Sequence, residues 1–111
     1  MAIVPAAELS SSLSVYLETL PSEPRLASYL AERGLAEHRV EIQATLDAAI
    51  KDTGDYLWMQ DGGVRWSGDF EDSLFSYLEA LHPWLTRASF KRLVAYGGWL
   101  CWHEGLNATP G

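Results

Sequence analysis

The first third of the chain carries apolar residues at every third or fourth position, the spacing of one face of an α-helix. The earliest run ends at Pro21 and consists of Leu9, Leu13, Tyr16, Leu17 and Leu20. In the next run, Ser22 can cap a helix, Pro24 fits its first turn, and Gly34 suits the position after its last turn. The pattern predicts helices over residues 9–20 and 22–34.

A third run follows at once and keeps the same spacing. Its apolar face is formed by Leu35, His38, Ile42, Leu46, Ala49 and Ile50. Gly54 is expected to end this helix, because glycine is the residue most often found where a helix stops.

From Tyr56 the alternation changes to every second position, which is typical of a β-strand with one buried face. Residues 56–60 and 64–66 are expected to pair as a β-hairpin around Asp61-Gly62-Gly63. A turn at Asp61-Gly62 would bury Leu57, Met59, Val64 and Trp66. A turn at Gly62-Gly63 would change the pairing, so the register stays open.

Asp69 is expected to cap a fourth helix, and Pro83 is expected to end or kink it. Its apolar face is formed by Phe70, Leu74, Tyr77, Leu78 and Leu81. After a connector over 84–91, residues 92–96 and 99–103 flank Gly97-Gly98, a dipeptide that favours a two-residue turn. This predicts a second hairpin, with Leu93, Ala95, Leu100 and Trp102 on one face and Val94, Tyr96, Trp99, Cys101 and His103 on the other.

These elements predict one α+β domain over residues 1–111, in the order ααα-ββ-α-ββ. The part up to residue 55 is helical, and the part over 56–111 is hairpin, helix and hairpin. The composition agrees with this division, since seven of the nine glycines and all five tryptophans lie after residue 55. Three helices are therefore expected to pack on an antiparallel sheet.

The charge excludes several classes of partner. The 111 residues include 15 acids against 8 lysines and arginines, a net charge of -7. Nucleic acids and anionic membranes attract basic proteins, so neither is an expected partner. A single cysteine, no secretory leader and no run of apolar residues long enough to cross a bilayer together predict a cytoplasmic protein.

Cys101 and His103 are the best candidates for catalysis. Two positions apart on a strand, they would share a face, and a nearby imidazolium can lower the pKa of a thiol. A free cysteine between Leu100 and Trp102 more often packs as a small apolar side chain. We therefore predict no catalytic residue.

Metal and cofactor sites are not expected either. The three histidines, at positions 38, 82 and 103, lack the spacing of metal ligands. The acids Asp69, Glu71 and Asp72 fit the first turn of a helix, where the helix dipole favours them. The glycine pairs match no phosphate-binding or dinucleotide-binding motif.

The aromatic residues point to a protein-binding surface. Alternation places Tyr56 and Trp58 on the outer face of the first hairpin, near Arg65, and Tyr96 and Trp99 at the turn of the second. Exposed tryptophan and tyrosine beside arginine are typical of binding hot spots. Acids of the helical part, Glu37, Glu41 and Asp47, would add attraction for a basic partner. The alternative is that the helices cover these aromatics, which would then be core.

The predicted function is a small acidic protein, monomer or homodimer, that binds and blocks a basic surface of another protein without catalysis. Immunity proteins, antitoxins and anti-CRISPR or anti-nuclease inhibitors are of this kind. Two alternatives stay open. One is a secretion chaperone or adaptor that binds a client peptide. The other is a small enzyme using Cys101 and His103.

Overall fold

A computed structural model describes residues 4–18 and 20–107. The helices, in chain order, are α1 (Ala6–Tyr16), α2 (Glu23–Glu32), the 3₁₀ turn η1 (Ala36–His38), α3 (Arg39–Trp58), α4 (Gly68–Leu81) and α5 (Arg87–Glu104). The described residues form no strand, and their one isolated bridge joins Val64 and Asn107. The predicted α+β class is therefore wrong, and the fold is all-helical.

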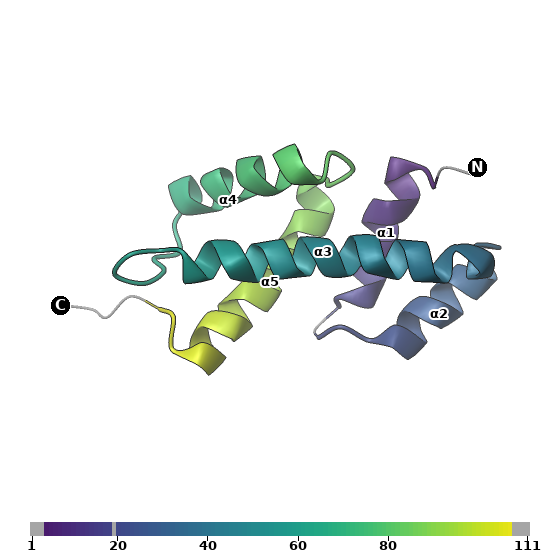
Figure 1. Cartoon of the computed structure of the whole chain (residues 1–111), viewed down its shortest axis with the longest axis horizontal. Helices are drawn as coiled ribbons and strands as arrows, with labels where there is room; N and C mark the ends of the chain where they lie inside the picture. The colour runs from purple at the N-terminus through teal and green to yellow at the C-terminus, as the bar shows by residue number, and fades with distance from the viewer. Residues whose placement is uncertain (1–3, 19, 108–111) are drawn as a thin grey trace.

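Helix α3 is the spine of the molecule (Figure 1). It runs along the longest dimension of a body that measures 52 × 25 × 18 Å. Helices α1 and α2 pack near its N-terminal part, α4 and α5 pack near its C-terminal part, and α1 also contacts α5. Each end of α3 is thus covered by a different pair of helices.

The three N-terminal helices were predicted from the sequence, with shifted ends. Helix α1 begins and ends a few residues earlier than expected. The Ser22 hydroxyl accepts a hydrogen bond from the backbone N–H of Arg25, and Gly34 takes a φ of +72°, so the predicted start and end of α2 are confirmed.

Gly54, however, does not end α3, which continues to Trp58. A Cβ at this position would lie in ordinary contact with the Leu100 side chain, at 3.5 Å. Glycine inside a helix costs about 1 kcal/mol relative to alanine. Packing of the long apolar face of α3 offsets that cost.

The first predicted hairpin is wrong for this reason. Its first strand is the last turn of α3 and the residues that follow it. Gly62 and Gly63 do form a turn, with φ values of +77° and +92°. Val64 then donates its backbone N–H to the carbonyl oxygen of Leu106, at 2.8 Å, so it pairs with the segment after α5 instead of with α3.

The second predicted hairpin is wrong as well, because α5 runs straight through Gly97 and Gly98. The helix is started by a capping box, in which Thr86 and Ser89 each bond the other's backbone, and it is ended by Gly105 at a φ of +68°. Close packing favours a residue without a side chain at position 97. A Cβ there would lie 3.1 Å from the Trp66 ring and 3.2 Å from the Leu57 side chain.

Helix α4 was predicted with nearly correct bounds. Its cap is Ser67, whose hydroxyl accepts from the Phe70 backbone N–H, and not Asp69. It ends at Leu81, two residues before Pro83. Every helix in the described part of the chain is too short or too polar to cross a membrane.

Candidate functional site

Helix α5 carries a column of stacked rings near its C-terminal end. The ring centroids of Tyr96 and Trp99 lie 5.9 Å apart, and those of Trp99 and His103 lie 4.9 Å apart with planes at 20°. These residues are three and four positions apart, which brings their side chains together on one side of a helix. Tyr96 and Trp99, both predicted site residues, are thus neighbours.

Trp102 lies beside this column and is 74% exposed, the largest apolar surface that α5 leaves in water. The hairpin hypothesis placed it on one face with Leu93, Ala95 and Leu100. In the helix, the buried positions Phe90, Leu93, Gly97 and Cys101 define one side, and position 102 falls away from them. Sequence reasoning missed Trp102, although counting residues 87–104 with a period of 3.6 would have found it.

Trp58 lies at the same end of the molecule, at the end of α3 (Figure 1). It is 59% exposed. Together with Gly105 and Leu106, which follow α5, it lines a shallow hollow. We call Trp58, Trp99 and Trp102 the aromatic end.

The other residues of the predicted binding surface are elsewhere. Tyr56 is half-buried between α3 and α4, with its ring 4.9 Å from that of Tyr77 and 5.8 Å from that of Phe70. It is part of the packing between these helices. Arg65 is exposed in the connection between α3 and α4.

The three predicted acids lie away from the aromatic end. Glu37 is in η1 and Glu41 in the first turn of α3. Seventeen residues of helix separate Glu41 from Trp58, which is about 25 Å. The structure therefore does not join these acids and the tryptophans into one surface.

Asp47, the third acid, bonds within the protein. Its carboxylate accepts a hydrogen bond of 2.7 Å from the buried Tyr16 hydroxyl, which ties α1 to α3. Burial, and then this bond, hold the pKa of Tyr16 well above its ordinary value. Asp47 thus has a structural contact that its sequence position did not indicate.

Cys101 and His103 do not form a pair. Two positions apart on a helix, their side chains point in directions about 160° apart. Cys101 is completely buried, and burial raises the pKa of its thiol, an effect that the Trp66 side chain partly offsets. His103 is exposed and faces Trp99 and Glu104. The geometry on which the enzyme alternative depended is absent.

One histidine does meet a carboxylate. The His82 Nε2 atom lies 2.7 Å from the Asp52 carboxylate, and this contact links the end of α4 to α3. His82 is buried, and its ring packs edge-to-face against the Trp84 ring. In residues 4–18 and 20–107, no three histidine, cysteine, aspartate or glutamate side chains are grouped as they would be around a metal ion.

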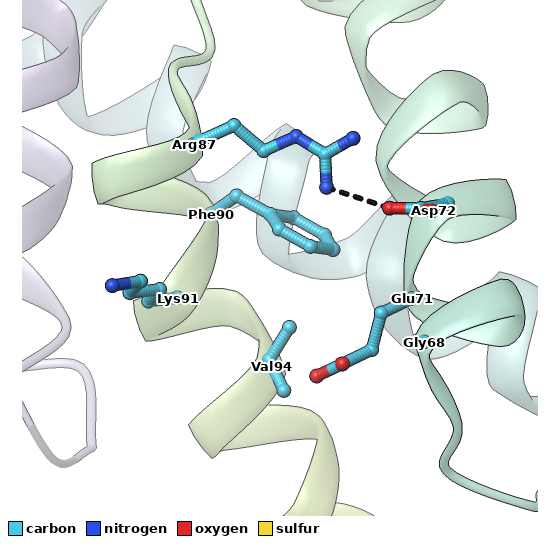
Figure 2. A pocket seen from close by; sticks show the side chains of 7 residues that line it. All are labelled: Gly68, Glu71, Asp72, Arg87, Phe90, Lys91 and Val94. Atoms are coloured by element: carbon cyan, nitrogen blue, oxygen red, sulfur yellow. Dashed lines mark hydrogen bonds and ion pairs between the residues drawn. The ribbon is translucent and has the colours of Figure 1, made fainter.

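A second surface is the groove between α4 and α5 (Figure 2). It encloses about 280 Å³ over an apolar floor that includes Phe90 and Val94. The Arg87 guanidinium crosses it, donates to the Asp72 carboxylate at 3.0 Å, and lies over the Phe75 ring at 4.1 Å. The sequence did not predict this groove, because its α5 wall was expected to be a connector and a strand.

No protein-family model, curated protein or solved structure matches this chain. We therefore infer a function from the two surfaces of the chain itself, the aromatic end and the groove between α4 and α5.

Proposed function

We propose that this protein binds and blocks a basic surface of another protein, and that the aromatic end makes the contact. The exposure of Trp102 carries this proposal. An indole left largely in water forgoes the stabilisation of about 2 to 3 kcal/mol that burial of a large apolar side chain supplies. Two further tryptophans are exposed at the same end of the molecule, and tryptophan is the residue type most enriched among binding hot spots.

Trp99, one of the three tryptophans of the aromatic end, is held in a stack of rings on α5. A stack built on a helix, with Trp99 between Tyr96 and His103, holds its rings before any partner arrives. Fixing side chains in advance lowers the entropy lost on association. We therefore expect these rings to slow dissociation of the complex.

The net charge of -7 supports a basic partner protein. Opposite charges speed encounter, and the effect acts over the whole surface. Glu37 and Glu41 lie much farther from the aromatic end than the Debye length of about 8 Å at physiological salt. They are thus expected to affect association more than the final contact.

Capture of the partner from the native host, followed by surface plasmon resonance, tests the proposal. Trp102→Ala and Trp99→Ala should each accelerate dissociation by about tenfold or more, the 1.4 kcal/mol or more expected of a hot spot. Glu37→Lys with Glu41→Lys should slow association and leave dissociation nearly unchanged.

The matched control is Val40→Ala, which removes an equally exposed apolar side chain from the opposite end of α3. Thermal melts of all variants should agree within a few degrees. An equal effect of Val40→Ala and Trp102→Ala on dissociation would refute the aromatic end as the contact surface.

One of the two binding modes expected of a chaperone has no counterpart in the described residues. Its client peptide was expected to add to a sheet edge or to enter a groove, and the described residues contain no sheet. Capture of many unrelated peptides, instead of one basic protein, would favour this alternative over inhibition.

A further inference from the structure

Helices α4 and α5 carry opposite charges. Helix α4 has four acidic residues and no lysine or arginine: Asp69, Glu71, Asp72 and Glu79. The first six residues of α5 include three basic residues and no acid: Arg87, Lys91 and Arg92. Of these residues, Glu71 and Asp72 line the groove from α4, and Arg87 and Lys91 line it from α5, so the groove has an acidic wall and a basic wall.

These charges are only partly used within the chain: Arg87 pairs with Asp72, and the Arg92 side chain donates to the carbonyl oxygen of Glu18 at 3.3 Å. In the part of the chain that the structure describes, Arg87 with Asp72 is the one ion pair that joins the two helices. The Glu71 carboxylate points into the groove toward Val94, whereas the Lys91 side chain extends away from α4 (Figure 2). The Glu71 carboxylate and the Lys91 ammonium group thus have no ion-pair partner among the described residues.

We infer that the groove face binds a second copy of the same chain, with α4 of each copy lying over α5 of the other. In a two-fold dimer, residue i of one copy meets residue j of the other, and j meets i. A face that is acidic on one side and basic on the other satisfies this rule with itself. Lys91 of each copy would then approach Glu71 of the other, and Val94, the partly exposed residue of the floor beside the buried Phe90, would lose its contact with water.

The size of the groove face sets the expected affinity of the dimer. The 14 residues of α4 span about 21 Å, so the two helices offer an area at the low end of specific interfaces. The dimer is expected to dissociate on dilution at about micromolar concentration. The groove lining ends at Val94, more than one helical turn before Trp99, so the dimer does not depend on the function proposed for the aromatic end.

Charge reversal and mixing test this dimer. Sedimentation equilibrium of the full chain from about 1 to 300 µM should detect a dimer of the natural sequence. Glu71→Lys and Lys91→Glu should each weaken it by at least about tenfold. An equimolar mixture of the two variants should regain it, because every reversed residue then meets a reversed partner.

Matched controls separate this effect from net charge. Glu71→Lys changes the net charge from -7 to -5, a change that by itself would reduce repulsion between copies. Glu32→Lys and Arg39→Glu alter the net charge equally at exposed positions outside the groove, and they should leave the dimer unchanged. If the melt shows that Glu71→Lys does not fold, Glu71→Gln should weaken the dimer in the same direction.

Three results would overturn the inference. The first is a natural chain that stays monomeric over the whole concentration range. The second is a dimer that neither reversal weakens, which would place the interface elsewhere, with the aromatic end as the next candidate. The third is a mixture that associates no better than either variant alone, which would mean that Glu71 and Lys91 do not meet across a two-fold axis.

Discussion

The two ends of α3 are covered by different kinds of side chain. At its N-terminal end, leucine and isoleucine dominate the contacts with α1 and α2, and the largest of them are fully buried: Leu13, Leu26, Leu30, Ile42 and Leu46. At its C-terminal end, aromatic rings dominate, and Trp66 packs among Leu57, Phe70 and Gly97. The first end buries both of its tyrosines at least in part, whereas the second leaves three tryptophans exposed.

This difference shows which side chains a small helical protein can bury between its helices. A leucine fits between neighbouring helical turns without any special partner. An indole is larger, and the Trp66 indole packs against a glycine, Gly97, on the facing helix. Trp102, in contrast, is 74% exposed, so its ring stays outside. The exposed tryptophans are therefore a surplus that packing alone does not explain.

The largest expected effect is the difference in free energy of unfolding between variants of Trp66 and of Trp102. Trp66→Ala should lower the free energy of unfolding by about 3 kcal/mol or more, because it leaves a cavity against Gly97 and Phe70. Trp102→Ala should change it by no more than about 0.5 kcal/mol. Urea unfolding of both variants, followed by circular dichroism, measures the difference. Equal losses would mean that Trp102 is part of the core.

The second prediction compares adjacent glycines in α5. Gly97→Leu should destabilise the protein by about 2 to 3 kcal/mol, because its side chain would enter the space of the Trp66 ring and the Leu57 side chain. Gly98→Ala should stabilise it by about 0.5 to 1 kcal/mol, since a Cβ there meets nothing within 4 Å and alanine favours a helix.

Thermal melts measure both glycine variants. In a chain of this length, 1 kcal/mol corresponds to about 4 °C in Tm. If residues 92–103 formed a hairpin with a turn at the two glycines, both substitutions would destabilise the protein. Opposite signs are thus expected only for a continuous helix that contacts Trp66 at residue 97.

The smallest effect concerns Tyr16, at the leucine end. Tyr16→Phe removes the hydrogen bond to Asp47 and should cost about 1 kcal/mol at neutral pH. The pKa of Tyr16 is raised in the folded chain above its unfolded value of about 10. Above this pH the unfolded chain releases a proton that the folded chain keeps, so the contribution of this hydroxyl to stability falls as pH rises.

The stability of Tyr16→Phe should therefore depend less on pH than the stability of the natural chain. Above about pH 10, the advantage of the natural chain over Tyr16→Phe should shrink by up to about 1.4 kcal/mol per pH unit. Urea unfolding of both proteins between about pH 8 and 11 measures this advantage. A constant difference over that range would show that Tyr16 ionises equally in the folded and unfolded chains.

The candidate site was predicted only in part. Tyr96 and Trp99 are three positions apart, so they meet on a helix even though the prediction placed them near a strand turn. Trp58 is exposed as expected, because it lies in the last turn of a helix and not for the reason of strand alternation. Trp102 was grouped on one strand face with Leu93, which is buried, whereas Trp102 is exposed, since alternate residues share a face in a strand but each residue turns by 100° in a helix.

The sequence by itself determined the helices that carry their own local signals. Ser22 and Gly34 mark the two ends of α2, and the leucine spacing of the first half needs no distant partner to predict a helix. The acidic balance also follows from composition alone.

The tertiary structure decided the state of the glycine-rich half. Gly54, Gly97 and Gly98 are locally ambiguous, because glycine is as suited to a turn as it is poor in a helix. Gly97 packs against the Trp66 ring, which lies 31 residues earlier in the chain and would be 3.1 Å from a Cβ at position 97. A contact at that separation leaves no periodic trace in the sequence, so the helix through Gly97 is set by packing and not by local preference.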